Sequence, residues 1–248
     1  MCLAWSLAEL GEFGEALARA DEAVEIAETV DQPLSRTVAY VGRGVVCLRR
    51  GEHARAIDVL EQALALIRDW NIPLWFPRVA SSLGVAYALG GRPAEGVPLV
   101  ARAVERATAM RLIGGLSLLV GYHAEACLLA GRHDEAATLA ARAVALAREH
   151  RERGYEAMAL RITGEAALAR NDVRAAEAAL IEAAALAEAL GMQPLLGHDD
   201  LGLGLAARRR GDDEESRRRL TAARTRYAEL GMAAWVSRAD EMLGAAAR

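Results

Sequence analysis

The chain has 248 residues, of which 53% are hydrophobic, 26% are charged and only 4% are aromatic. Its 30 lysines and arginines and 34 aspartates and glutamates give a net charge of -4, which excludes a general electrostatic attraction to nucleic acid or to an anionic membrane. No uncharged stretch of about 18 residues and no leader-like start is present, so the sequence predicts a cytoplasmic protein without a membrane partner.

A glycine recurs every 40 residues along the chain (51 − 11 = 40). The column consists of Gly11, Gly51, Gly91, Gly131, Asn171 and Gly211, with asparagine as its one exception. Glycine just past the last turn of a helix adopts a positive φ at no steric cost, and asparagine tolerates the same conformation next best. We therefore predict that each position is a turn between the two helices of a repeated hairpin.

The expected helices follow this period in chain order. A short helix precedes the turn at Gly11, so the chain starts inside a repeat. In the next unit, helical periodicity predicts a first helix over 34–50, called helix A, and a second helix, called helix B, from 52 or 53 to about 69. Prolines stand near the starts of later A helices at Pro33, Pro73 and Pro194. Continuing to a closing helix from about 233 gives about thirteen helices in one repeat domain, 1–248.

Two further columns predict close packing within each hairpin. Small residues recur in the middle of helix A at Ala4, Gly44, Gly84, Ala124, Gly164, Gly204 and Gly244. Helix B carries Ala23, Ala63, Ala103, Ala143, Ala183 and Ala223. Glycine inside a helix costs about 1 kcal/mol relative to alanine, so its recurrence indicates a closely approaching neighbour, and we expect the two columns to face each other. The fold class that follows is all-α, a right-handed superhelical α-solenoid of antiparallel helix hairpins.

These residues resemble the tetratricopeptide repeat family. The similarity is carried by Leu83, Gly84, Tyr87, Val100 and Ala103, and again by Leu203, Gly204, Leu220 and Ala223. The unit is longer than the usual repeat of about 34 residues in that family. The segment from Gly191 to Trp235 is similar to the C-terminal repeat regions of large bacterial signalling proteins, which join such repeats to adenylyl cyclase, NTPase or DNA-binding modules. The resemblance implies a non-catalytic module for protein binding in bacterial signalling or transcription regulation.

In an array of this kind helix A lines the concave surface, and columns three or four residues apart along helix A define a candidate groove. We predict that this groove binds a protein or peptide segment. The candidate residues are Val38, Val41, Val45, Val85, Glu125, Arg161, Glu165, His198 and Leu201. The N-terminal half of the groove is aliphatic and its middle is charged, which suits a segment with one apolar and one charged end.

Other interpretations of the same residues stay open. Helix packing can cover the aliphatic positions, and Arg161 with Glu165, four residues apart, can form an ordinary surface salt bridge. The concave wall can instead close around a peptide or small molecule, with a change of curvature as the output. The apolar ends of the array can also stack on those of another copy and produce end-to-end self-association.

Motifs for catalysis are absent from the sequence: it contains no phosphate loop, nucleophile elbow, zinc-binding pair or dinucleotide-binding turn. His198 and the two aspartates that follow it point about 100° apart on a helix, so they do not converge on one ion. His123 has no partner in the repeat pattern. Cys47 and Cys127 share one column and are expected to be small core residues. We therefore expect no enzyme activity, no cofactor and no metal.

Overall fold

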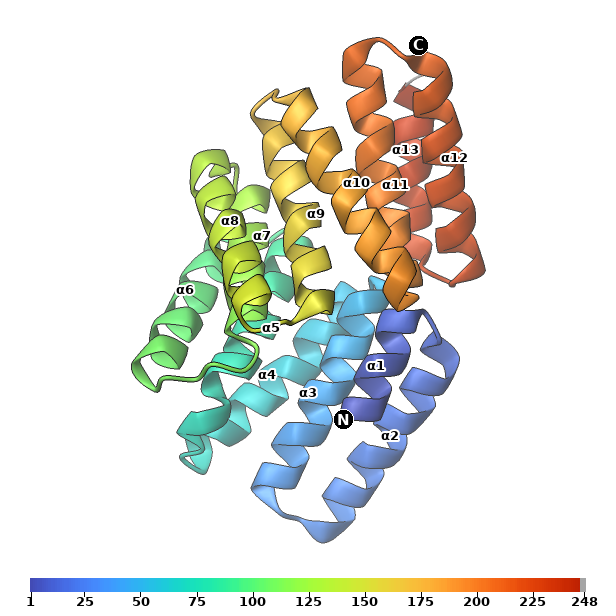
Figure 1. Ribbon diagram of the computed structural model, residues 1–248. Coiled ribbons are helices and arrows are strands. Elements are labelled where there is room, and N and C mark those ends of the chain that lie inside the picture. The colour runs from blue at the N-terminus through green and yellow to red at the C-terminus, as the bar shows by residue number, and fades with distance from the viewer. Residues whose placement is uncertain (246–248) are drawn as a thin grey trace.

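The structure is a computed structural model, and it describes residues 1–245. These residues form thirteen α-helices and one short 3-10 helix, arranged as sequential hairpins (Figure 1). The elements are α1 (Cys2–Leu10), α2 (Phe13–Val30), α3 (Pro33–Arg50), α4 (His53–Asp69), η1 (Pro73–Trp75), α5 (Phe76–Leu89), α6 (Pro93–Ala109), α7 (Leu116–Leu129), α8 (His133–Glu149), α9 (Arg153–Ala169), α10 (Val173–Leu190), α11 (Gln193–Arg210), α12 (Asp213–Glu229) and α13 (Ala233–Ala245). Odd-numbered helices are the A helices and even-numbered helices are the B helices. The prediction of an all-α solenoid of about thirteen helices is confirmed.

The turn after each A helix has the expected backbone conformation. The φ angles are +90° at Gly11, +89° at Gly51, +83° at Gly91, +75° at Gly131, +63° at Asn171 and +84° at Gly211. At the end of α3, for example, the N–H of Gly51 donates a hydrogen bond to the carbonyl of Leu48. The period in the sequence therefore reflects a steric requirement for the left-handed conformation at the end of the helix.

A second column of positive φ ends the B helices, and the sequence did not reveal it. It consists of Asp31, Asn71, Arg111, Arg151, Gly191 and Gly231, with φ between +49° and +69°. Only two of these six residues are glycines. Because the residue type changes from repeat to repeat, the sequence does not show that these positions recur. The third unit also departs from the pattern, because η1 intervenes after Pro73 and its A helix begins only at Phe76.

Glycines in the A helices allow B-helix side chains to approach closely. A Cβ added at Gly84 would lie 2.4 Å from Cγ2 of Val100, and one added at Gly44 would lie 2.6 Å from Cγ of Leu60. The equivalent contacts are Gly164 to Leu180 and Gly204 to Leu220. The glycine column therefore faces this aliphatic column, and not the alanine column three residues later as we predicted. The larger aliphatic side chains occupy the space that a missing Cβ leaves.

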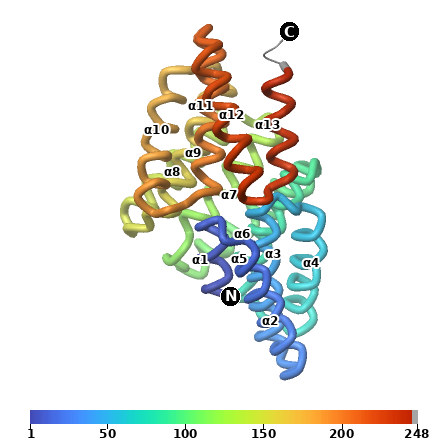
Figure 2. The backbone as a smooth tube through the Cα atoms, turned by 90° about the vertical axis from the view of Figure 1, so that its right-hand side faces the viewer, coloured from blue at the N-terminus to red at the C-terminus, as the bar shows by residue number. Residues whose placement is uncertain are grey.

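The two ends of the solenoid meet. The turn at Gly11 lies against Leu230, and the turn at Gly51 lies against Trp235 of α13. One hydrophobic cluster joins residues of α1 and α2, such as Ala8, to residues of the last helices, such as Tyr227. Figures 1 and 2 agree in placing the N-terminal helices next to α11 and α13. The superhelix therefore closes into a ring, because its first and last units share a core.

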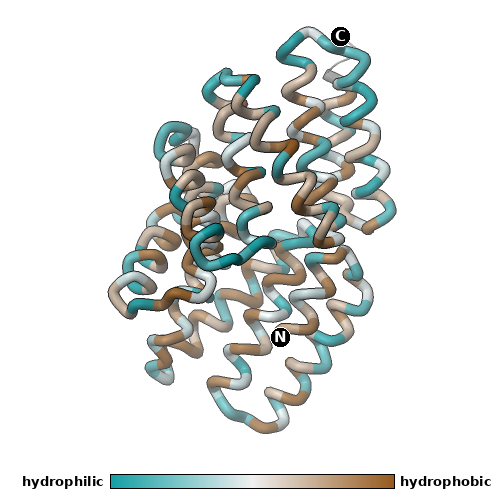
Figure 3. The backbone as a smooth tube through the Cα atoms, in the orientation of Figure 1, coloured by the Kyte–Doolittle hydropathy of each residue, from teal (hydrophilic) through white to brown (hydrophobic). Residues whose placement is uncertain are grey.

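Some helices, such as α4 and α6, are amphipathic, whereas α7 and α11 are buried on most sides; hydrophobic and hydrophilic residues are interleaved along the chain in Figure 3. In α4, for example, the buried residues are Ala56, Ile57, Leu60, Ala63 and Ile67, which recur at three- and four-residue spacing. Among the described residues, we find no helix with both the length and the apolar character that crossing a membrane requires.

Candidate functional site

The inner surface of the ring encloses a cavity. Its volume is about 670 Å³, counted with the part that is open to solvent. Every lining residue belongs to an odd-numbered helix. They are Glu9, Leu48, Arg49, Val85, Leu89, Ser117, Leu118, Gly121, Tyr122, Glu125, Tyr155, Met158, Ala159, Arg161, Ile162, Pro194, Leu195, His198 and Trp235. All seven A helices contribute, so the closure of the ring brings the two ends of the chain to one site.

An ion-pair network lies in the cavity wall between α7 and α9. Arg161 donates hydrogen bonds to Glu125 at 2.6 Å and to Glu165 at 2.7 Å, and its side chain is only 10% exposed. Burial opposes the charge on Arg161, but the two carboxylates raise its pKa above the usual value. Burial also raises the pKa of Glu165. The network is thus largely removed from solvent and differs from the surface salt bridge that the residue spacing also allowed.

A second ion pair connects the first helix to the same wall. Arg49 donates a hydrogen bond to Glu9 at 2.8 Å, and the indole N–H of Trp5 donates to the same carboxylate at 3.0 Å. The guanidinium of Arg49 lies 5.5 Å from the ring centroid of Tyr122 and 3.4 Å from Sδ of Met158. Arg49 therefore links four A helices, α1, α3, α7 and α9, around the cavity.

The C-terminal side of the cavity is aromatic. The Nδ1 atom of His198 lies 2.8 Å from the hydroxyl of Tyr227, and the ring of His198 lies 4.3 Å from that of Trp235. Burial lowers the pKa of His198 well below its usual value, and the positive charges of Arg161 and Arg49 act in the same direction. The imidazole is therefore neutral at pH 7.

Asp199 and Asp200 diverge from His198, as their spacing predicts. Asp200 accepts a hydrogen bond from Arg219 at 2.8 Å. Asp199 is 1% exposed, and neither of its carboxylate oxygens has a hydrogen-bond partner among the described residues. Burial raises the pKa of Asp199 to about 8, although the charge of Arg161 acts in the opposite direction. Asp199 is therefore mostly protonated at pH 7.

Three lining residues carry a buried polar atom that no other described residue satisfies. These atoms are Oη of Tyr122, Nε1 of Trp235 and Nε of Arg161. Buried polar atoms in folded proteins are nearly always hydrogen-bonded, and all three of these can donate a hydrogen bond. These three donors therefore have no partner within the described part of the chain, and each of the three atoms is itself shielded from solvent.

The predicted groove residues fall into three groups, at the cavity, in the core, and in mixed positions. Glu125, Arg161 and His198 line the cavity, and Glu165 pairs with Arg161 beside it. Val41 and Val45 are fully buried in the core around α3, with Val79 and Ala80 of α5 in the same cluster. The expectation that these two valines offer a surface to a partner is thus wrong, because helix packing covers them.

The other three predicted residues have mixed positions. Val85 is fully buried but forms part of the inner wall of the cavity. Val38 is half-buried and does not line the cavity. Leu201 is 9% exposed and belongs to the cluster that joins the two ends of the ring. The aliphatic half of the predicted groove is therefore mostly core.

Sequence reasoning missed most of the lining residues, and among them are the polar and aromatic residues Glu9, Arg49, Tyr122 and Trp235. A signal for the first two was present, because they have opposite charges in one repeat column, one period apart (49 − 9 = 40). Residues in one column lie on equivalent faces of neighbouring A helices. No local signal marks Trp235, whose place at the cavity depends on ring closure.

This architecture defines a helical-repeat solenoid whose A helices enclose a central site. Two family models match the sequence, and both are described as tetratricopeptide repeat. One matches residues 1–69, and the other matches residues 77–102 and 121–142. The matched segments together cover a little under half of the chain, and the described helices have the fold of a tetratricopeptide repeat solenoid. No curated protein matches the sequence.

Several solved structures share the fold at low sequence identity. A Rap protein complexed with competence and sporulation factor is 17% identical with a TM-score of 0.72, over 92% of this chain and 63% of that one. BtubC (BKLC) from P. vanneervenii is 16% identical with a TM-score of 0.61, over 88% of this chain and 92% of that one. A signal transduction ATPase with numerous domains (STAND) and a tetratricopeptide repeat sensor, from Pyrococcus horikoshii, is 18% identical with a TM-score of 0.56. That match covers 98% of this chain and 37% of the ATPase.

Proposed function

We propose that the chain is a non-catalytic binding module that holds a peptide, or an extended segment of a partner protein, in the central cavity. The observation that carries this proposal is the lining of the cavity, where buried charged groups and unsatisfied hydrogen-bond donors from separate A helices surround one space. Groups of this kind fix the orientation of a ligand, and the apolar side chains between them provide contact area.

The lining also indicates what the segment contains. The hydroxyl of Tyr122 and the indole N–H of Trp235 have no acceptor among the described residues. A side-chain rotation that turns them toward the cavity would let them donate to the carbonyl groups of an extended peptide backbone. Met158 and Leu195 provide apolar contacts for a hydrophobic side chain. Because Arg49 and Arg161 already pair with carboxylates, the segment does not need a negative charge to enter.

We place this module in bacterial cytoplasmic signalling or transcription regulation. The Rap protein complexed with competence and sporulation factor supports this context, and the signal transduction ATPase with a tetratricopeptide repeat sensor supports the signalling role, although its source, Pyrococcus horikoshii, is an archaeon. The chain spans less than two thirds of each of these proteins, so a role as one part of a longer regulatory protein is also part of the proposal.

A second candidate function is a sensor whose superhelix changes curvature on binding. The contacts between the two ends of the ring favour this second function. The turn at Gly11 lies against Leu230, and the turn at Gly51 lies against Trp235. A ligand that enters the cavity and separates these contacts would open the ring. The shape change would then transmit the binding event.

The cavity offers a direct test at Gly121 of α7. A Cβ added there meets only Cδ1 of Ile162, at 3.9 Å, so a longer side chain extends into the cavity without a clash at Cβ. We expect Gly121→Met to block binding and leave the fold intact. The control is Gly14→Met in α2, because Gly14 is exposed and a Cβ there has no atom within 4 Å.

The experiment selects peptides from a displayed random library on the wild-type chain and measures their affinities by fluorescence anisotropy. Peptides that bind the wild type and Gly14→Met equally, and bind Gly121→Met at least about tenfold more weakly, support the cavity as the site. Equal binding to all three proteins contradicts it. Small-angle X-ray scattering with a selected peptide then separates the two candidates, since only the sensor changes its radius of gyration.

A further inference from the structure

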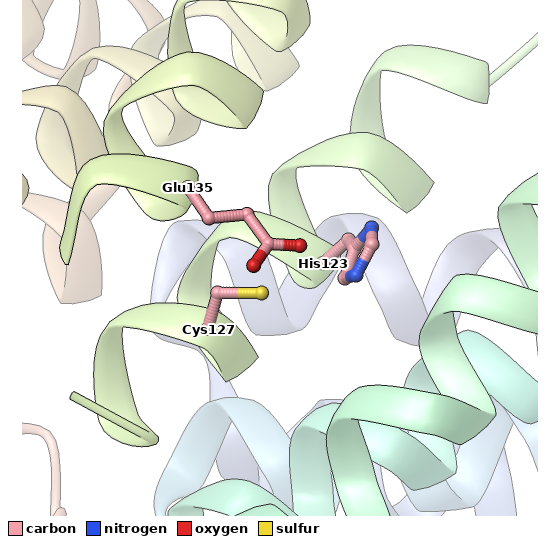
Figure 4. Close-up of side chains that lie close together, drawn as sticks. All are labelled: His123, Cys127 and Glu135. Atoms are coloured by element: carbon pink, nitrogen blue, oxygen red, sulfur yellow. The ribbon is translucent and has the colours of Figure 1, made fainter. Parts of the chain in front are cut away.

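Three potential metal ligands from the fourth hairpin lie together away from the cavity. They are His123 and Cys127 of α7 and Glu135 in the first turn of α8 (Figure 4). His123 and Cys127 are four residues apart, so they occupy one face of their helix. The turn at Gly131 then brings Glu135 to the same place. One nitrogen, one sulfur and one carboxylate oxygen all lie within 4.8 Å of one another.

This donor set matches the chemistry of zinc. Zinc binds thiolate at about 2.3 Å, and imidazole and carboxylate at about 2.0 to 2.2 Å, in tetrahedral sites. Tetrahedral geometry at these lengths separates the donor atoms by about 3.5 Å. The three atoms therefore need only small side-chain rotations to reach one ion. Three protein ligands leave the fourth position for water or for an external ligand.

The repeat pattern accounts for Cys127 and Glu135 but not for His123. The equivalent positions two periods earlier are Arg43, Cys47 and Arg55 (123 − 43 = 80). Cys47 is as fully buried as Cys127, so packing explains a cysteine in this column. Glutamate recurs in the column of Glu135, at Glu15, Glu95 and Glu215, so it is part of the repeat. The histidine is not, because its column otherwise holds residues such as Arg43, Leu83 and Thr163.

We propose that His123, Cys127 and Glu135 form a binding site for one Zn²⁺ ion. In this site His123 contributes a ring nitrogen, Cys127 its sulfur and Glu135 a carboxylate oxygen. On binding, the Cys127 S–H bond is exchanged for a sulfur–zinc bond, and the proton passes to solvent. Because the site joins α7 to α8, the ion would cross-link the two helices of the fourth hairpin.

The residues around His123, Cys127 and Glu135 allow the ion to bind. Glu135 pairs with Arg132 at 2.5 Å, but both side chains are substantially exposed, at 39% and 50%. An exposed ion pair of this kind contributes little stability, so Glu135 can turn toward the ion. The half-buried positions of His123 and Glu135 leave a path for entry from solvent.

Cobalt is the probe for the test, because a cobalt–thiolate bond produces a near-ultraviolet charge-transfer band. The full chain, stripped with a chelator, is titrated with Co²⁺ and then with Zn²⁺. We expect one Co²⁺ per chain with a thiolate band, and displacement of the cobalt by zinc. Cys127→Ala should abolish the band, whereas Cys47→Ala and Cys2→Ser should retain it. His123→Gln and Glu135→Gln should each weaken binding by at least about tenfold.

Two results would overturn the site: no thiolate band with the wild-type chain, or a band that survives in Cys127→Ala. Circular dichroism of each variant checks the fold. If Cys127→Ala unfolds, Glu135→Gln still decides the question, because that side chain is partly exposed and its substitution leaves the core intact. Unchanged affinity for Co²⁺ in folded Glu135→Gln and folded His123→Gln would also refute the proposal.

Discussion

Gly51, at the end of α3, lies directly against the indole of Trp235 in α13. A Cβ at Gly51 would come within 2.9 Å of the indole Cδ1 atom. The same indole lies 4.3 Å from the ring of His198 and lines the cavity. One aromatic side chain therefore takes part both in closing the ring and in forming the central site.

Replacing Trp235 by alanine should open the ring. The variant loses the contacts with Gly51 and His198, and we expect it to lower the free energy of unfolding by roughly 2 kcal/mol, less than for a fully buried tryptophan. We also expect an increase in the radius of gyration, measured by small-angle X-ray scattering. Trp70→Ala is the control, because Trp70 is 62% exposed and its loss should change stability by no more than about 0.5 kcal/mol. An unchanged radius of gyration in Trp235→Ala would show that other contacts hold the ends together.

Two glycines in A helices should respond to alanine with opposite signs. Gly121→Ala should stabilise the chain by about 0.5 to 1 kcal/mol, because alanine favours the helix and its Cβ meets only one atom, at 3.9 Å. Gly84→Ala should destabilise it by about 1 to 3 kcal/mol, because its Cβ would lie 2.4 Å from a methyl carbon of Val100 and 2.8 Å from the carbonyl oxygen of Gly96. Urea denaturation measures both changes. Equal effects would contradict the assignment of Gly121 to the cavity and of Gly84 to the hairpin contact.

Removing the guanidinium of Arg161 should be much more costly than removing that of Arg148. Each arginine pairs with two glutamates, but the side chain of Arg161 is 10% exposed and that of Arg148 is 50% exposed. Arg161→Ala leaves Glu125 and Glu165 largely buried without a counter-charge, and we expect a loss of about 3 to 5 kcal/mol in the free energy of unfolding. Arg148→Ala should lose less than about 1 kcal/mol. Similar losses in the two variants would mean that solvent reaches the inner network.

Asp199 should make the protein less stable as the pH rises. Its pKa is about 8 in the folded chain and near 3.8 when unfolded, so the folded state holds an extra proton between these values. The free energy of unfolding then falls with increasing pH across this window, by up to about 1.4 kcal/mol per pH unit. Asp199→Asn should remove this slope and stabilise the chain at pH 8.

Denaturation at several pH values from 6.5 to 8.5 measures the effect of Asp199. At the lower end of this range the unfolded chain still binds some protons at His198, which acts in the opposite direction, so the difference between the wild-type and Asp199→Asn slopes is the measure of Asp199. Asp134→Asn is the control, because the Asp134 side chain is 91% exposed and should leave the slope unchanged. Parallel curves for the wild type and Asp199→Asn would show that the carboxyl is ionised in the folded chain.

Local sequence patterns do not predict which residues line the cavity or which residues form the proposed zinc site. Val41 and Arg49 both lie on α3, and the sequence does not show which of them faces the interior of the ring. The structure buries Val41 under neighbouring helices and places Arg49 at the cavity. His123 and Cys127 have the spacing of a ligand pair, but their relation to Glu135 depends on how α8 packs against α7.

The sequence by itself determined the helices, their number and the turns after the A helices. These features depend on interactions within a few residues, such as the positive φ that Gly51 and Asn171 accept at a helix end. Only the tertiary structure decided that the ring closes, that the cavity has buried ion pairs, and that α7 and α8 bring three potential ligands together. Those features depend on the cumulative rotation between successive hairpins and on contacts between residues far apart in the chain, which no local pattern encodes.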